Sequence, residues 1–282
     1  MIPVEPPASD GAALLDDVRQ FITRFVAFPR KASLIATTLW VVHTHAFEHA
    51  SATPYLNVYS PAPRCGKSTL FEVLSLIVRD PIGGSNMSPA VMYRIIEKEQ
   101  PTLLLDEMDA QMRADRERAS AIQSVLNSGY KRGATAVVWR CEAPSFNPVA
   151  FNVFCPKAFA GIGQASLHPT TLDRSVPILL ERKLATDTVE RYRARQVEPE
   201  ADKLRDRISD GVSANAELLA AARPALPDEL DDRAGEIWEP LLAITDAAGG
   251  SWPRTARAAA IELHSEPDLC LLYTSPSPRD RS

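Results

Sequence analysis

The residues best suited to chemistry lie in one short run, Ser60–Thr69, whose sequence is SPAPRCGKST. The run stands between a β-type and a helix-type segment, and the first turn of a helix presents free backbone N–H groups to an anion. In a phosphate-binding loop a glycine allows close approach of the phosphate, a lysine reaches the β- and γ-phosphates, and a hydroxyl ligates Mg²⁺. Gly66, Lys67 and Ser68 match these roles. The predicted nucleotide-binding residues are Pro63, Arg64, Cys65, Gly66, Lys67, Ser68 and Thr69.

A second segment adds the context that a bare Gly-Lys-Ser lacks. The apolar run Thr102–Leu105 ends in Asp106 and Glu107. An acidic residue at this point can hold Mg²⁺ through water, and its neighbour can polarise the attacking water as a general base. We assign Asp106 and Ser68 to the metal, and Glu107 and Lys67 to catalysis with ATP and Mg²⁺ as cofactors. The alternative is an exposed Asp-Glu turn at the end of a strand.

Arg174 is a further candidate for catalysis. It precedes an apolar run that ends at Leu180. In some ATPase modules an arginine before the last core strand reaches the γ-phosphate held by a neighbouring subunit. In that role Arg174 would make the active unit a homo-oligomer. The alternative is a buried structural pair of Asp173 and Arg174.

Charge restricts how the chain can meet nucleic acid. Its 282 residues include 31 Lys and Arg against 36 Asp and Glu, which gives a formal net charge of -5. Any contact with single- or double-stranded DNA must therefore be local. Tyr130–Gly133, with the sequence YKRG, offers two cations beside an aromatic ring for a phosphodiester backbone. A solvated helix end explains the same residues equally well.

His45–His49 has the pattern H-x-x-E-H, which defines a rival class of enzyme, the inverted zincin metalloproteases. His45 and His49 are one helical turn apart and able to share a zinc ion. However, the apolar face of the expected helix includes His45, and the spacing indicates no third ligand. A histidine in the core or at its boundary is the simpler interpretation.

Cysteine usage and hydropathy indicate the compartment. Cys65, Cys141, Cys155 and Cys270 form no C-x-x-C pair and no repeated spacing, so neither a disulfide framework nor a thiolate zinc site is expected. The N-terminus lacks a signal-peptide pattern, and the most apolar stretch, residues 32–50, contains Thr, His and Glu. We therefore expect a cytoplasmic protein without a membrane partner.

The elements that must position these residues follow from the periodicity of the apolar side chains. Helices are predicted over Gly11–Phe28, Lys31–Ala50, Leu70–Val78, Ser88–Glu99 and Ala119–Tyr130. Strands are predicted over Tyr55–Tyr59, Thr102–Asp106, Ala134–Cys141, Val149–Phe154, Pro156–Ala160 and Val176–Leu180, the third and fourth as a hairpin. Strands that alternate with helices predict an α/β fold with a mostly parallel sheet.

Composition divides the chain into four parts. We predict a helical N-terminal lead over 1–50, a nucleotide-binding core over 51–183 and a helical C-terminal lid over 184–269. The tail, residues 270–282, resembles the translation of a sequencing adapter. A natural Ser/Pro tail is the alternative. On the adapter interpretation the native chain continues differently after about Leu269.

Short segments spread over the chain to about Ala260 carry a family resemblance. They are Leu15–Val18, Leu39–His45, Ser60–Pro61, Gly66–Lys67, Leu103–Glu107, Leu126–Gly129, Arg132–Ala134, Ala160–Gly163, Asp173–Ser175 and Trp238–Leu242. Together they resemble the domain-of-unknown-function family 3631, P-loop ATPase-like proteins found in phage and plasmid replication contexts.

The resemblance implies an AAA-like P-loop NTPase core with flanking helical segments, and ATP hydrolysis coupled to replication or helicase-like remodelling of DNA. It also implies that Pro61, in place of the first glycine of the loop, is ordinary. Arg64 and Cys65 stand where members tend to have Gly-Ser, and Arg64 removes backbone freedom from the loop. The alternative function is a nucleotide-gated binding module that recruits a partner with little turnover.

Overall fold

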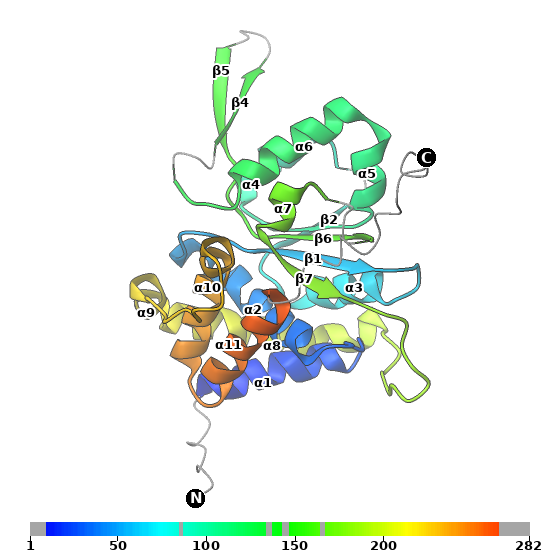
Figure 1. Cartoon of the computed structure of the whole chain (residues 1–282), viewed down its shortest axis with the longest axis vertical. Helices are drawn as coiled ribbons and strands as arrows, with labels where there is room; N and C mark the ends of the chain where they lie inside the picture. Colours follow the sequence, from blue (N-terminus) through cyan, green and yellow to red (C-terminus); the bar gives the residue numbers. More distant parts are fainter. Residues whose placement is uncertain (1–9, 85–86, 134–136, 143–146, 164–166, 265–282) are drawn as a thin grey trace, which may run out of the picture.

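A parallel β-sheet runs through the middle of the computed structural model, which describes residues 10–84, 87–133, 137–142, 147–163 and 167–264 (Figure 1). In this part of the chain the sheet has five strands in the order β2-β3-β6-β1-β7, and all neighbours are parallel. Their bounds are β1 Tyr55–Ser60, β2 Pro81–Gly84, β3 Thr102–Leu105, β6 Lys157–Ile162 and β7 Ser175–Leu179. The prediction of an α/β fold with a mostly parallel sheet is confirmed.

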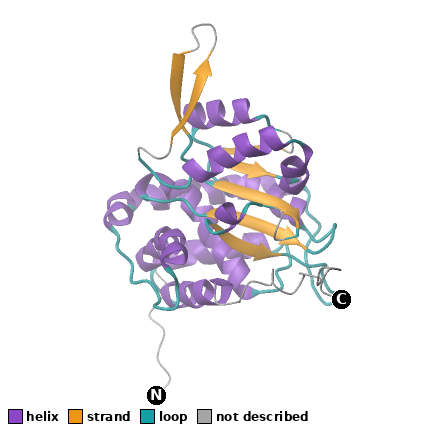
Figure 2. Ribbon diagram, turned by 45° about the horizontal axis from the view of Figure 1, so that its top comes forward, coloured by secondary structure: helices purple, strands orange, loops and turns teal. Residues whose placement is uncertain are grey.

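Helices cover both faces of this sheet (Figure 2). Those on one face are α1 Asp10–Thr23, α2 Lys31–Ala46, α3 Lys67–Ile77, α8 Ala194–Ala214, α10 Asp232–Ala248 and α11 Trp252–His264. Those on the other are α4 Pro89–Glu99, α5 Met108–Ala114, α6 Arg116–Ser128 and α7 Pro169–Leu172. A 3₁₀ turn, η1 Phe47–His49, follows α2, and the short α9 Ala216–Ala221 precedes α10.

Alternating side chains of the strands supply the two cores. Leu56 and Val58 of β1 join the cluster that contains α1, α2, α3 and α8, whereas Tyr55 joins the cluster that contains α4 and α6. In β3, Leu104 belongs to the first cluster and Leu103 to the second. Since both faces of a parallel sheet are covered, its strands read as continuous apolar runs. This is why Thr102–Leu105 was recognisable as a strand.

The antiparallel pair β4 Val137–Glu142 and β5 Asn147–Asn152 confirms the predicted hairpin. It stands out from the body of the molecule beside α4 and α6 (Figure 1). Val138 and Phe151 lie opposite each other at its base and are buried, and the Phe151 ring lies 4.6 Å from that of Tyr93 in α4. The base is thus packed, whereas the outer part projects into solvent.

Several element bounds differ from the sequence-based expectation. Helix α1 ends at Thr23 instead of Phe28, although Phe25 and Val26 remain buried in the segment that leads to α2. Strand β2 was missed, because Pro81–Gly84 contains one proline and two glycines and becomes a strand only by pairing with β3 at the sheet edge. Helix α5 was also missed.

Helices from the two ends of the chain share one core. Trp40 of α2 and Trp238 of α10 are both fully buried in the cluster that also contains α1, α8 and α11. The boundaries predicted at residues 50 and 183 fall in segments that connect helices to strands, and the division into domains stays a prediction. The tail 270–282, with Cys270, lies outside the described residues. No described helix is long and apolar enough to cross a membrane.

Helix α2 is buried on almost all sides, and His43 is buried with it. His43 is 1% exposed, and its Nε2 lies 2.9 Å from Oγ1 of Thr53, just before β1. Burial lowers the pKa of His43 to about 3 from an ordinary value of 6.5, because an imidazolium loses its hydration there. His43 is therefore neutral in the folded protein at physiological pH.

Acid should destabilise the fold through His43. Its folded pKa lies below its unfolded pKa, so the unfolded chain binds more protons between pH 6.5 and 3, and the stability present above pH 6.5 is lost as the pH falls. We expect urea unfolding to show about 2 kcal/mol less stability at pH 5 than at pH 7 from this residue. His43→Gln should flatten that dependence. Parallel pH curves for the two proteins would contradict the assignment.

Candidate functional site

The loop between β1 and α3 has the local geometry of an anion site. Gly66 is the N-cap of α3, with a φ of 88°, and the helix begins at Lys67. A left-handed φ favours glycine, and a Cβ built on Gly66 would have nothing within 4 Å. The space beside Gly66 is thus open directly before the first turn of α3, whose N–H groups no intrahelical bond can satisfy.

The order of the strands brings the second predicted segment to this loop. Strand β6 alone separates β1 from β3, and the carboxyl ends of parallel strands meet at one edge of the sheet. The Ser68 hydroxyl donates to Oδ2 of Asp106 over 3.3 Å. Oδ1 of Asp106 accepts from the backbone N–H of Glu107 at 2.8 Å. The two residues predicted to share a metal are thus in contact.

Glu107 occupies a strained position at the same edge. It is the N-cap of α5, with φ 56° and ψ 32°, which a non-glycine residue adopts at a cost of about 1–2 kcal/mol. The left-handed residue turns the chain from β3 into α5 directly after Asp106. Its side chain is exposed. Glu107 is therefore accessible beside the Ser68–Asp106 pair.

The middle of the loop is held from within. The Cys65 side chain is buried, and its Sγ donates to the carbonyl of Ala62 at 3.2 Å. Arg64 is exposed and has a φ of 64°. The family resemblance implies a glycine at this position. The backbone here is left-handed, a conformation that strains an arginine but not a glycine.

Arg174 lies away from the loop of its own chain. It precedes β7, whose Ser175 pairs with Tyr55, the first residue of β1, whereas the loop follows Ser60, the last. Six residues of strand separate these ends by about 20 Å. The structure therefore does not bring Arg174 to Lys67 or Asp106 within one chain.

The Arg174 side chain is engaged at the amino ends of the strands. Its guanidinium carbon lies 4.6 Å from the centre of the Tyr130 ring, and its Nη1 donates to the Thr170 carbonyl. The Tyr130 hydroxyl accepts from Arg233 and donates to Glu236 over 3.2 Å, both residues of α10. This stack joins α6, β7 and α10.

The neighbouring basic residues are also used within the chain. Lys131 forms an ion pair with Glu236, and the guanidinium of Arg132 lies 5.3 Å from the centre of the Phe154 ring. These side chains contact other parts of the chain, so Tyr130–Gly133 is more than the solvated helix end that was one of its two interpretations. The other interpretation, a contact with DNA, stays a prediction.

The H-x-x-E-H segment does not lie on one helix. Helix α2 ends at Ala46, between His45 and His49. Nε2 of His45 is 3.0 Å from the Ile77 carbonyl, and Glu48 pairs with Arg79 at 2.9 Å. Among the described residues no three His, Cys, Asp or Glu side chains form a group able to hold a metal ion.

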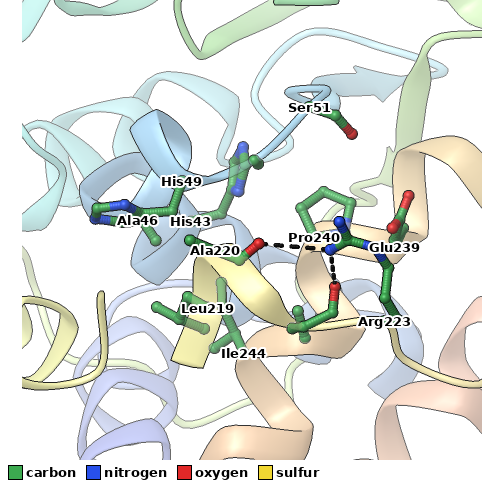
Figure 3. A pocket seen from close by; sticks show the side chains of 13 residues that line it. His43, Ala46, His49, Ser51, Leu219, Ala220, Arg223, Glu239, Pro240 and Ile244 are labelled. Carbon is green, nitrogen blue, oxygen red and sulfur yellow. Dashed lines mark hydrogen bonds between the residues drawn. The ribbon is translucent and has the colours of Figure 1, made fainter. Parts of the chain in front are cut away.

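A cavity of about 220 Å³ lies near the opposite end of β1 from the loop (Figure 3). It is enclosed by α2 with η1, the end of α9 and α10, and it includes His43, His49, Arg223 and Glu239 among its lining residues. Arg223 Nη1 donates to the carbonyls of Ala220 and Ala222. None of the residues predicted to bind nucleotide lines this cavity.

Two functional candidates were not assigned from the sequence. Ser60 accepts a hydrogen bond from Lys67 Nζ at 2.6 Å, and Trp139 on β4 is 63% exposed. Ser60 was visible as the polar residue that ends an apolar strand seven positions before the lysine. The sequence did not indicate that Trp139 is exposed, because the alternation of side chains along a hairpin does not show which of its two faces is covered.

The strain at position 64 is testable. Arg64→Gly should raise the free energy of unfolding by about 0.5–1 kcal/mol, because relief of the left-handed strain exceeds the entropy cost of glycine. Urea unfolding measures this change.

Two further variants serve as controls. Gln100→Gly, at the C-cap of α4 with a φ of 44°, should give a similar gain in stability. Arg182→Gly, at an exposed position without a positive φ, should instead lower stability. A loss with Arg64→Gly would show that the strain is not the dominant effect.

Two comparisons relate parts of the chain to known proteins. The model of the family described as "Protein of unknown function (DUF3631)" matches residues 179–269. A Saccharopolyspora erythraea protein named "Uncharacterized 28.9 kDa protein in xis 5'region" is 38% identical over 87 residues, or 31% of this chain and 32% of the relative. The chain thus matches about a third of that relative's length. Ser60–Thr69 and Asp106 lie outside the range that the family model matches. The resemblance predicted from the sequence is confirmed over residues 179–269, where the family model matches this chain.

Proposed function

We propose that the chain is a P-loop NTPase that binds ATP with Mg²⁺ and hydrolyses it. The observation that carries this proposal is the contact between Ser68, in the first turn of α3, and Asp106, at the end of β3. The sequence assigns these two residues, from separate segments, to the same metal ion, and the fold brings them into contact. The left-handed Gly66 and the open space above it support close approach of a phosphate to the amides of α3.

The donor set fits a hard divalent cation. Mg²⁺ prefers oxygen ligands, and the Ser68 hydroxyl and the Asp106 carboxylate are oxygen donors already 3.3 Å apart. When bound, the ion neutralises charge on the phosphates. Lys67 supplies a further positive charge at the N-terminus of α3, and the helix amides add their partial charges. These groups of the chain would hold the triphosphate in place.

Glu107 would orient and deprotonate the attacking water. Its side chain is exposed next to Asp106, and the left-handed turn fixes the point from which it leaves the backbone. Strained residues persist where the surrounding structure holds them, and they cluster at functional sites. The second candidate, a nucleotide-gated module with little turnover, differs only in whether Glu107 acts as a base.

Variants of the two charged residues separate binding from chemistry. Lys67→Ala should weaken Mg·ATP binding by roughly 10–100-fold, because charge-assisted hydrogen bonds to phosphate are lost. Glu107→Gln should keep binding but lower kcat by roughly 10²–10⁴. Titration calorimetry and phosphate release measure the two effects.

Lys98→Ala and Glu99→Gln provide matched controls, because these residues form an exposed ion pair at the end of α4. Both controls should leave binding and turnover unchanged. Equal loss of binding in Lys67→Ala and Glu107→Gln would refute the role of Glu107. Tight binding with negligible turnover in the unmodified protein would favour the gated module.

We further propose that hydrolysis is coupled to DNA through the β4–β5 hairpin. Trp139 directly follows the buried Val138 on β4 and is 63% exposed, while Val138 and Phe151 anchor the base against α4. An exposed indole offers a stacking platform for an unpaired base. The hairpin lies in the chain between α6 and β6 and enters β6 at its amino end, so β6 would link it to the opposite sheet edge, where Asp106 follows β3.

The wider setting of this activity is also a proposal. The relative's name places that protein in the 5' region of xis, which supports a role in replication of a mobile element. Arg174 would complete the site of a neighbouring copy in a homo-oligomer. The described cysteines Cys65, Cys141 and Cys155 are free thiols, which supports a reducing, cytoplasmic setting.

The hairpin assignment has its own test. Trp139→Ala should weaken binding of single-stranded DNA by roughly 5–100-fold, the range for loss of one stacked base, and reduce any stimulation of ATPase activity by DNA. Fluorescence anisotropy with a labelled oligonucleotide measures the affinity. Leu218→Ala, on the exposed surface of α9, is the matched control and should have no effect. Equal DNA affinity in both variants would exclude Trp139 as the contact.

A further inference from the structure

The hydroxyl of Ser60 links the end of the central strand to the lysine of the loop. Ser60 is the last residue of β1 and is fully buried. Its backbone is fixed, because its carbonyl accepts from the N–H of Gly163 at 3.0 Å, beyond the end of β6. Its Oγ contacts the Ala62 carbonyl at 2.7 Å and Lys67 Nζ at 2.6 Å. One buried side chain thus bridges the two ends of the loop.

Chemistry fixes the direction of both hydrogen bonds. A carbonyl oxygen only accepts and an ammonium group only donates, whereas a serine hydroxyl has one proton and two lone pairs. The Ser60 proton must therefore go to Ala62, and a lone pair of Oγ must receive a proton of Lys67. The chain of donors runs in one direction, from Lys67 through Ser60 to Ala62.

The prolines make this arrangement rigid. Pro61 and Pro63 flank Ala62, and each fixes its own φ near -65° while restricting the residue before it to extended backbone. The Ala62 carbonyl is therefore held in a fixed position relative to Ser60. This gives a physical reason why proline is acceptable where a glycine was expected at position 61.

A lysine side chain has a flexible four-carbon stem, and holding its ammonium in one place costs rotamer entropy. The hydrogen bond to Ser60 offsets this entropy cost before a ligand binds. It uses only one of the three N–H donors of Lys67. The remaining donors are able to meet phosphate oxygens. Preorganisation of this kind increases affinity without a new contact to the ligand.

We propose that Ser60 is a positioning residue that holds the Lys67 ammonium inside the loop, ready for the β- and γ-phosphates. This inference rests on the nucleotide binding proposed above. It predicts a loss that depends on the number of phosphates, since Lys67 reaches only the outer ones.

Titration calorimetry of the full chain with Mg·ATP, ADP and AMP tests it. Ser60→Ala should bind ATP and ADP roughly tenfold more weakly and AMP unchanged, which matches the loss of one hydrogen bond to a charged group. Ser60→Thr, which retains the hydroxyl, should restore most of the affinity. Ser175→Ala is the matched control, because Ser175 is also a buried serine that donates to a backbone carbonyl, that of Thr171 at 2.6 Å. It should not change nucleotide affinity.

A second measurement needs no nucleotide. Acetylation of Lys67 by an amine-reactive reagent, followed by mass spectrometry, should be several-fold faster in Ser60→Ala than in the unmodified protein, with the exposed Lys98 as the internal standard. Equal acetylation of Lys67 in both, ATP affinity that is unchanged or tighter in Ser60→Ala, or an equal loss for AMP would overturn the role of Ser60. Failure of the unmodified protein to bind ATP would instead overturn the proposed function.

Discussion

Burial of the parallel sheet between two helical layers constrains everything else in this structure. Parallel strands are joined by crossovers that return each chain segment to the same starting edge, so all the carboxyl ends collect at the other edge. Because β6 lies between β1 and β3, the segments that follow β1 and β3 face each other across a single strand. Ser68 and Asp106 meet for this reason. Neither their separation in the chain nor their local sequence requires it.

Backbone strain occurs at both edges of the sheet. Of the four described residues other than glycine with a positive φ, Arg64 and Glu107 belong to the candidate site, and Asp80 and Gln100 precede β2 and β3 at the other edge. The rigid segment Ser60–Pro63 and the buried Cys65 side chain hold the loop from within. Residues in unfavourable conformations persist only where their surroundings determine them, which is consistent with a surface built for ligand contact. The strain and the preorganised Lys67 therefore belong to one arrangement.

The amino ends of the strands connect the sheet to helix α10. There Tyr130 stacks with Arg174 and bonds to Arg233 and Glu236, so α6 and β7 are tied to α10. Helix α10 lies in the range that matches the DUF3631 family. Through α10, the part of the chain that matches the family model contacts the edge opposite the candidate nucleotide site, while α8 in the same range packs against α3. A substitution of Arg174 is expected to disturb the packing of both helical layers, because its guanidinium stacks on Tyr130 between them.

The sequence by itself determined most of the strands and helices and the residues worth examining. Apolar runs such as Thr102–Leu105 identify buried strands, and the Ser88–Pro89 cap marks the start of α4, because these signals depend on neighbours in the chain. Only the tertiary structure decided the pairing of Pro81–Gly84 as an edge strand, the place of Arg174 away from the loop, and the role of Ser60 as acceptor for Lys67. Each of these three features depends on a partner that is distant in the sequence or on the direction in which a side chain points. The local periodicity of apolar residues predicts neither of these, because the order of the strands determines which distant segments come into contact.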